Sequence, residues 1–183
     1  MKQIHRVFGL AVILLTAHGF TETQQTQLNN LTSAEYQTQF NKLVSHGYRP
    51  IKIWSKALQV IDYQPGETPR LGFWGRFERV PSTTPWVARH GITGGAYQRE
   101  FETWTRQGYM PTDINVAYLN GRASYCVIFD KVDNQPAWQA RHGLNYSTYQ
   151  NINTSLINQG YRRRITSSCP TPLGPLYAAL WAK

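Results

Sequence analysis

The sequence predicts an α+β fold made of three tandem helix–strand–strand units. Their strands are expected to form one antiparallel sheet of about six strands with the helices on one side. Two observations lead to this prediction: the chain matches itself when shifted by 52 residues, and each matching segment shows a helical pattern followed by two strand patterns. One unit alone cannot bury its apolar face, so three are expected to stack. The pattern does not decide whether the sheet stays open or curls toward a ring.

Two anchors define each copy. The first is Tyr-Gln, followed by Gly-Tyr eleven residues after the first tyrosine, and it begins at Tyr36, Tyr97 and Tyr149. The second is the aromatic residue that ends the last strand pattern: Phe77, Phe129 and Trp181. The tyrosines are 61 and then 52 residues apart, whereas the ending residues are 52 apart both times. The first copy therefore carries extra residues, and we expect one domain over 20–183 with repeats at 31–80, 92–131 and 144–183.

The helices are predicted from their apolar stripes and end signals. Thr32 and Glu35 have the spacing of a capping box at the start of the first helix. The third stripe is weaker, because Asn153 stands where the other copies have phenylalanine. The helices are expected to end at left-handed glycines, namely Gly47, Gly108 and Gly160.

The clearest hairpin is in the second copy, where Asn120-Gly121 is a preferred two-residue turn. The register that follows pairs Tyr118 with Ala123, Val116 with Tyr125 and Ile114 with Val127. The row facing the helices is then Ile114, Val116, Tyr118, Tyr125, Val127 and Phe129. The opposite face carries Asn115, Ala117, Ser124 and Cys126. In the first copy, the extra residues lengthen the hairpin around Tyr63–Pro69.

The segments WVARHG at Trp86 and WQARHG at Trp138 are nearly identical, and each begins nine residues after the end of a copy. We interpret these WxARHG segments as linkers that act as hinges between units. Gly91 and Gly143 permit a sharp turn into the next helix, and the tryptophan can pack under the linker. Before the first helix the matching place holds Asn29-Asn30, and asparagine also tolerates left-handed geometry.

The N-terminus has the pattern of a secretory signal peptide over residues 1–19. A basic start precedes the apolar run Val7–Ala17, which is too short to span a bilayer, and a polar sequence follows. The alternative is an uncleaved membrane anchor. We expect a secreted or periplasmic protein that meets a membrane only if the signal stays uncleaved. The net charge of +9 is scattered, apart from Arg162–Arg164, so a nucleic-acid partner is not expected.

The linker and helix residues W-x-A-R-H-G, then Y-Q-x-x-F and Gly-Tyr, resemble the bacterial tandem repeat domain family, whose repeats have about fifty residues. Similar repeats form the N-terminal domain of fungal polyglycine hydrolases, which are secreted proteases. In those proteins catalysis belongs to an attached β-lactamase-like serine hydrolase domain, whose Ser-x-x-Lys motif is absent from this chain. The resemblance covers Leu31–Lys183 and implies a repeat domain without its catalytic companion.

The repeated pairs Arg89-His90 and Arg141-His142 are candidate ligand-binding residues, because repeated polar residues could converge when units stack. In the alternative that we favour, arginine bonds strand-end carbonyls and histidine fixes the turn before the helix. Two histidines 52 residues apart, without nearby cysteine or acidic partners, make a poor metal site. The chain also lacks a cofactor fingerprint, so neither a metal nor a cofactor is expected.

Trp54, Trp74 and Tyr63 lie in or beside the enlarged first hairpin. The two tryptophans are expected on the sheet face opposite the helices, where aromatic side chains often bind glycans or extended peptides. Alternatively, they close a second hydrophobic layer.

Cys126 and Cys169 are the two cysteines of the chain, and in an oxidising compartment they are expected to form a disulfide. If consecutive units continue one sheet, the last strand of the second unit lies beside the first strand of the third, and the two sulfurs can meet. A nucleophilic role for Cys126 is not expected, because the sequence places no activating charge near it.

Three functions remain open from the sequence. The first is a secreted non-catalytic module that binds a cell-surface glycan or a protein partner. The second is an accessory domain acting with a separate β-lactamase-like serine hydrolase. The third is a hydrolase with an unrecognised histidine and arginine site. Three Asn-x-Ser/Thr triplets would matter only in a eukaryotic source, and they begin at Asn30, Asn145 and Asn153.

Overall fold

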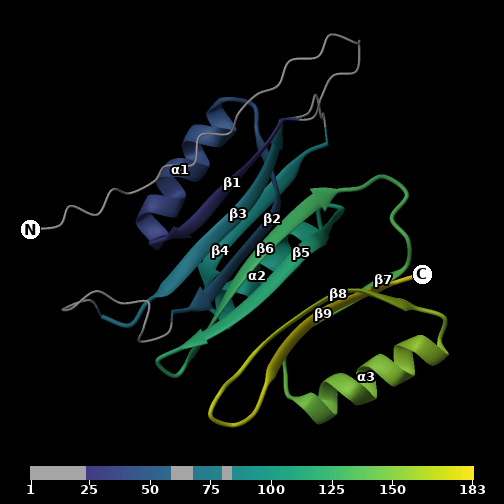
Figure 1. The fold of residues 1–183 in the computed structure, drawn as a ribbon. Helices are drawn as coiled ribbons and strands as arrows, with labels where there is room; N and C mark the ends of the chain where they lie inside the picture. The colour runs from purple at the N-terminus through teal and green to yellow at the C-terminus, as the bar shows by residue number, and fades with distance from the viewer. Residues whose placement is uncertain (1–23, 59–67, 80–83) are drawn as a thin grey trace, which may run out of the picture.

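The computed structural model describes residues 24–58, 68–79 and 84–183 (Figure 1). The predicted signal peptide and Tyr63 lie outside the described residues. Within these ranges, the order strand, helix, strand, strand occurs three times. The first unit holds β1 (Gln24–Leu31), α1 (Ser33–Ser45), β2 (Arg49–Ala57) and β3 (Leu71–Arg79). The second holds β4 (Trp86–Ile92), α2 (Gly94–Thr105), β5 (Tyr109–Leu119) and β6 (Arg122–Lys131), and the third β7 (Trp138–Leu144), α3 (Tyr146–Asn158), β8 (Arg162–Cys169) and β9 (Leu176–Ala182).

The strands form three separate three-stranded antiparallel sheets rather than one sheet of about six strands. Their orders are β1-β3-β2, β4-β6-β5 and β7-β9-β8, so the last strand of each unit is the centre of its own sheet. The fold still combines helices with antiparallel strands, but the prediction of one continuous sheet is wrong. Two neighbours already flank each central strand, which leaves it no edge for pairing with the next unit.

The WxARHG segments are strands, so the hinge interpretation is wrong and each unit begins one strand earlier than predicted. β4 and β7 pair with the central strands of their own sheets, with Ala88 opposite Ile128 and Ala140 opposite Leu180. Gly91, at φ 65°, lies in a bulge where the register shifts between Arg89 and Ile92. This bulge hides the strand in the sequence, because it breaks the period of two just before the helix begins.

The predicted helix ends and hairpin register are confirmed. Thr32 and Glu35 form both bonds of a capping box at the start of α1. The three helices end at glycines with φ of 81°, 81° and 85°, namely Gly47, Gly108 and Gly160. The β5–β6 register pairs Tyr118 with Ala123, Val116 with Tyr125 and Ile114 with Val127. Local signals are therefore sufficient to place elements whose partners lie close in sequence.

Each sheet has a front face, which its own helix covers, and a back face. The front face of the first sheet packs on the back face of the second, since Ile53, Phe73 and Phe77 share one buried cluster with Cys126 and Ile128. The front face of the second sheet packs in the same way on the third, in a cluster that includes Val127, Phe129, Ala178 and Leu180. Figure 1 shows the three units following one another from α1 to α3. Among the described residues, no unit precedes the first one in the stack, so its back face does not pack on another sheet.

Side chains, not backbone ladders, join the sheet edges. Asp113 Oδ2 accepts the backbone N–H of Ile53 at 2.8 Å, and Asn115 Oδ1 accepts that of Ser55 at 2.9 Å. At the next joint, Ser167 Oγ accepts the N–H of Val116 at 2.9 Å. Asn115 and Ser167 occupy the same position of the repeat, 52 residues apart. The edge strands β2 and β5 thus have amide groups satisfied by the following unit, which protects them from pairing with other strands.

Cys126 and Cys169 are free thiols, so the predicted disulfide is wrong. Cys126 Sγ donates to Ser55 Oγ at 3.6 Å and packs in the core between the first and second units. Cys169 packs in the core between the second and third units. The prediction assumed that the second and third units share one sheet, whereas β6 is flanked by β4 and β5.

Candidate functional site

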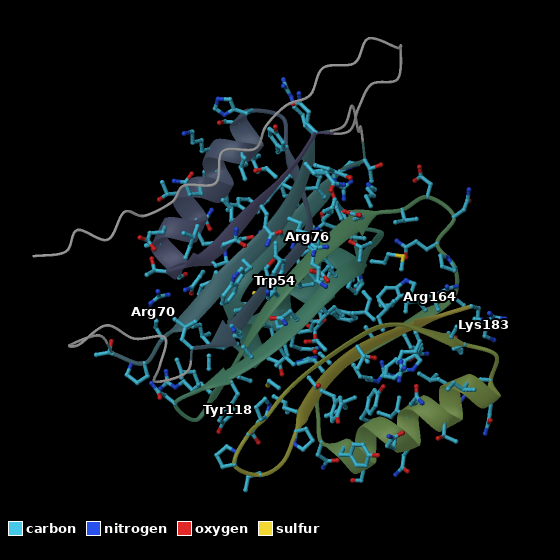
Figure 2. The ribbon with its side chains drawn as sticks, viewed as in Figure 1. Trp54, Arg70, Arg76, Tyr118, Arg164 and Lys183 are labelled. Atoms are coloured by element: carbon cyan, nitrogen blue, oxygen red, sulfur yellow. The ribbon has the colours of Figure 1, made fainter. Side chains whose placement is uncertain are left out.

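The back face of the first sheet carries a row of large aromatic and cationic side chains. Alternate residues of β2 and β3 point to this face, away from Phe73 and Phe77, which contact the rings of α1. Figure 2 shows Trp54 and Arg76 near each other over this sheet. We call the row the indole platform, and it consists of Lys52, Trp54, Lys56, Trp74 and Arg76.

The two indoles of the platform form a cross-strand pair. The rings of Trp54 and Trp74 have centroids 6.3 Å apart and planes only 9° apart. Gly72 provides the space for this arrangement, because a Cβ atom there would lie 2.6 Å from Cη2 of Trp74. The ring of Trp74 therefore lies over the glycine backbone, and both indoles stay half-buried. Parallel indoles of this kind offer a flat apolar surface to a planar or ring-shaped ligand.

Two lysines lie over the indoles. Lys52 Nζ is 5.7 Å from the centroid of Trp54, and Lys56 Nζ is 5.5 Å from that of Trp74. Arg76 lies directly across the strands from Lys52, and all three cationic side chains are exposed. An exposed cation–π contact is worth only about 0.5–1 kcal/mol, so a ligand can displace the ammonium groups from the rings.

The same positions of the repeat carry different residues in the other two units. Where the first unit has Arg76, the second and third have Ile128 and Leu180, which are 1% and 2% exposed. The remaining platform positions correspond as follows: Trp74 to Cys126 and Ala178, Lys56 to Ala117 and Cys169, Trp54 to Asn115 and Ser167, and Lys52 to Asp113 and Ile165. Large charged side chains occur only where no preceding unit covers them in the described structure.

A pocket of about 450 Å³ adjoins the platform where the three edge strands meet. We call it the junction pocket. Its walls come from all three units: Lys52 and Trp54 on β2, Asp113, Ile114 and Asn115 on β5, and Arg164, Ile165, Thr166 and Ser167 on β8. Lys52 and Trp54 belong to both the platform and the pocket, so the two surfaces are continuous.

Burial sets the electrostatics of the pocket floor. Desolvation raises the pKa of Asp113 to about 6, although the bond from the Ile53 amide and the nearby Lys52 charge act in the opposite direction. Asn115 donates its Nδ2 to Ser167 Oγ at 3.3 Å while its Oδ1 accepts from Ser55. The floor is therefore a hydrogen-bonded network between units.

The two motif histidines lie in separate joints between units. His90 packs against Tyr36 and Phe73 of the first unit, with ring centroids 4.8 and 5.2 Å apart. His142 packs against Tyr97 and Tyr125 of the second unit, at 4.5 and 5.4 Å. Burial lowers the pKa of both imidazoles. Each histidine thus carries a ring into the aromatic front face of the preceding unit, which explains why the motif recurs.

The motif arginines do not converge with each other. Arg89 Nε lies 3.1 Å from Glu100 Oε2, and its guanidinium lies over the ring of Trp104 in α2. Arg141 is exposed and donates to the carbonyl of Ala140 and to Gln139. Arg89 and His90 line one pocket of about 350 Å³, whereas Arg141 and His142 line another of about 340 Å³. The structure therefore does not bring the four candidate residues into one site.

The remaining candidate chemistry is structural. Burial raises the pKa of the Cys126 thiol to about 11 and also raises that of Cys169, so neither is an activated nucleophile. Asn145 caps α3 by accepting from the Thr148 amide, and Asn153 Oδ1 accepts from Trp181 Nε1. In the described ranges, no three His, Cys, Asp or Glu side chains are grouped to hold a metal, and no helix could cross a membrane.

The sequence prediction included Trp54 and Trp74 but missed the cations around them. Lys52, Lys56 and Arg76 are ordinary surface residues when each is considered alone. The missed signal was available in the repeat itself, since aligning the three copies places Arg76 on Ile128 and Leu180. A charged residue at a position that is apolar in every other copy indicates a surface without a neighbouring unit.

Comparison with known proteins agrees with the repeat structure. A family model described as a polyglycine hydrolase-like structural repeat matches residues 25–53, 83–132 and 135–183. The second and third matches each contain one complete unit of strand, helix, strand and strand. None of the curated proteins matches the chain. The family suspected from the motif is confirmed: the chain belongs to the polyglycine hydrolase-like structural repeat family.

Proposed function

We propose that this chain is a secreted, non-catalytic repeat module that binds a cell-surface glycan on the indole platform. One observation carries the proposal. The platform replaces small or apolar side chains of the other units with tryptophan, lysine and arginine, at positions where the described structure needs no packing. Two parallel indoles on an open sheet face, bordered by hydrogen-bond donors, match the apolar face and the hydroxyl groups of sugar rings.

The proposal excludes the motif histidines from function. His90 and His142 are occupied by aromatic packing in different pockets, so they support the scaffold that holds the platform. A hydrolase that used both would need them within reach of one substrate.

The test is a screen of the purified protein on glycan and peptide arrays, followed by titration of the best ligand. Trp54→Ala and Trp74→Ala are each expected to weaken binding at least about tenfold, since an aromatic anchor at an interface is worth about 2 kcal/mol. Trp104→Ala removes an indole from α2, where it bonds Glu100, and is expected to leave affinity unchanged. Equal losses in all three variants, or binding of peptides alone, would contradict the proposal.

The family match favours a second candidate, an accessory role beside a separate β-lactamase-like serine hydrolase. Under this candidate, adding the protein to such an enzyme from the same source raises kcat/KM, and Trp74→Ala removes the gain. An unchanged kcat/KM would exclude it.

A further inference from the structure

We infer that the junction pocket is a subsite for an acidic group, so that the ligand of the platform is an acidic polysaccharide. The inference rests on the proposed function for the rest of the ligand, because Trp54 and Lys52 border both surfaces. It depends on which polar groups in the pocket are already bonded and which remain available to a ligand.

The acceptors of the pocket floor are occupied by the protein itself. Asp113 Oδ2 accepts from the Ile53 amide, and Asn115 Oδ1 accepts from the Ser55 amide. Ser167 Oγ accepts from the Val116 amide at 2.9 Å and from Asn115 Nδ2 at 3.3 Å. A ligand that offers donors to this floor would have to break bonds that join the units.

The groups left for a ligand are donors. Arg164 is exposed on β8 and forms no ion pair or hydrogen bond with another described residue. Lys52 is exposed on the opposite wall and is held only by the ring of Trp54 and the charge of Asp113. Two cations face a pocket whose single described acid is turned toward the Ile53 amide.

The edge of β8 adds a backbone donor. Ile53 lies opposite Gly75, and Thr166 lies opposite Ala179, which is the same position of the repeat. The Ile53 amide leaves its sheet edge and bonds Asp113, so the Thr166 amide leaves the edge of β8 in the same way. Among the described residues no side chain accepts from it, and Thr166 lines the pocket. At the first joint, the Asp113 carboxylate accepts from an edge amide. A carboxylate of the ligand could accept from the Thr166 amide in the same way and from the Arg164 guanidinium at the same time.

Such an occupant fits the wider charge pattern. Lys52, Lys56 and Arg76 extend the cationic surface from the pocket across the indoles. A polymer of uronic acids offers both a sugar face for each indole and a carboxylate for the pocket, whereas a neutral glycan leaves the donors of the pocket to water.

The experiment measures affinity by calorimetry for hexagalacturonate and for its fully methyl-esterified form, in which each carboxylate loses its charge and gains a methyl group. Hexagalacturonate is expected to bind at least about tenfold more tightly, the effect of one charge-assisted hydrogen bond. Arg164→Gln is expected to remove this preference. Arg162→Gln is the matched control, since it removes the same charge from the same strand outside the pocket.

The outcomes separate the pocket from the platform. Equal affinity for acid and ester, equal losses in Arg164→Gln and Arg162→Gln, or no binding of the acid overturns the inference. In those cases, glycan binding that is lost in Trp74→Ala still supports the proposed function of the indole platform. If Trp74→Ala leaves affinity unchanged while Arg164→Gln abolishes the acid preference, acid binding in the junction pocket is supported and glycan binding on the indole platform is contradicted.

Discussion

The back faces of the first and second sheets share one backbone plan but carry opposite side chains. In the second sheet the back face holds Cys126 and Ile128, which are buried against the front face of the first unit. In the first sheet the same positions hold Trp74 and Arg76, which border solvent. The repeat therefore sets the position of a residue, whereas the presence of a preceding unit decides whether that position serves packing or remains available for binding.

Exchanging residues between the two back faces is expected to give the largest change in stability. Ile128→Arg places a bulky guanidinium in the buried joint between the first and second units, where Asp113, opposite it on β5, is already bonded to the Ile53 amide; the free energy of unfolding is expected to fall by about 3 kcal/mol. The reverse change, Arg76→Ile on the open face, is expected to alter it by less than about 0.5 kcal/mol. Urea unfolding measures both. Similar losses in the two variants would show that the first back face is also covered.

A second prediction concerns the pH dependence of the joint that Asp113 makes. Burial raises its pKa from 3.8 to about 6, so between these values the folded protein holds a proton that the unfolded chain releases. The stabilisation from this proton is complete below pH 3.8 and lost as the pH rises through 6. Relative to Asp113→Asn, the wild-type free energy of unfolding is expected to fall by about 2 kcal/mol between pH 4 and pH 7. If the free energies of unfolding of the wild type and of Asp113→Asn change in parallel with pH, the burial of the Asp113 carboxyl is contradicted.

The third prediction compares the first strands of the units. His142→Ala removes a ring from the aromatic cluster of Tyr97 and Tyr125, with an expected loss of about 1–2 kcal/mol in the free energy of unfolding. Asn29, its counterpart in the first unit, is exposed, and Asn29→Ala is expected to cost less than about 0.5 kcal/mol. Thermal unfolding of the two variants measures both losses, and only His142→Ala is expected to lower the Tm clearly. The motif would be a ligand site rather than a joint if His142→Ala lost glycan affinity at an unchanged Tm.

The smallest expected change in stability tests the geometry of the platform. Gly72→Ala puts a methyl group 2.5 Å from Asn30 Oδ1 and 2.6 Å from Cη2 of Trp74, so the Asn30 side chain must shift and the Trp74 ring is expected to tilt, at a cost of about 1 kcal/mol. The parallel indoles of Trp54 and Trp74 couple in near-ultraviolet circular dichroism, and this signal is expected to weaken. Glycan affinity is expected to fall with it. An unchanged spectrum would show that the glycine does not set the ring orientation.

The sequence was sufficient for features whose partners are local and insufficient for those that depend on neighbouring units. The capping box of Thr32, the turn at Asn120-Gly121 and the aromatic rows all follow from short-range patterns. The contacts between units do not, because a polar residue such as Asn115 can face solvent or satisfy an edge amide, and the sequence pattern is the same in both cases. Two of the wrong predictions, the continuous sheet and the disulfide, arose from assuming backbone pairing between units, and the third, the hinge interpretation, arose from the bulge at Gly91.

The candidate site shows the same limit. Trp54 and Trp74 were selected because exposed indoles are unusual, and the structure places them side by side on one sheet face. Whether they bind a ligand remains a prediction. The junction pocket could not be derived from sequence, because Lys52, Asp113 and Arg164 belong to three units and meet only through the stacking of the sheets.

The side-chain contacts between units also determine which gene duplications can add a repeat unit to such a chain. A duplication spanning residues 86–137, one full period of 52 residues, copies both halves of a joint together, because that segment carries Trp86 and His90 for the preceding unit and Tyr97 and Phe101 for the following one. The new copy would find partners on both sides without further substitutions. Duplicating the first unit would instead place Lys56, Trp74 and Arg76 inside a joint. Lengthening of the array is therefore expected to proceed by copying units such as the second one, while the unit with the open back face is expected to remain single.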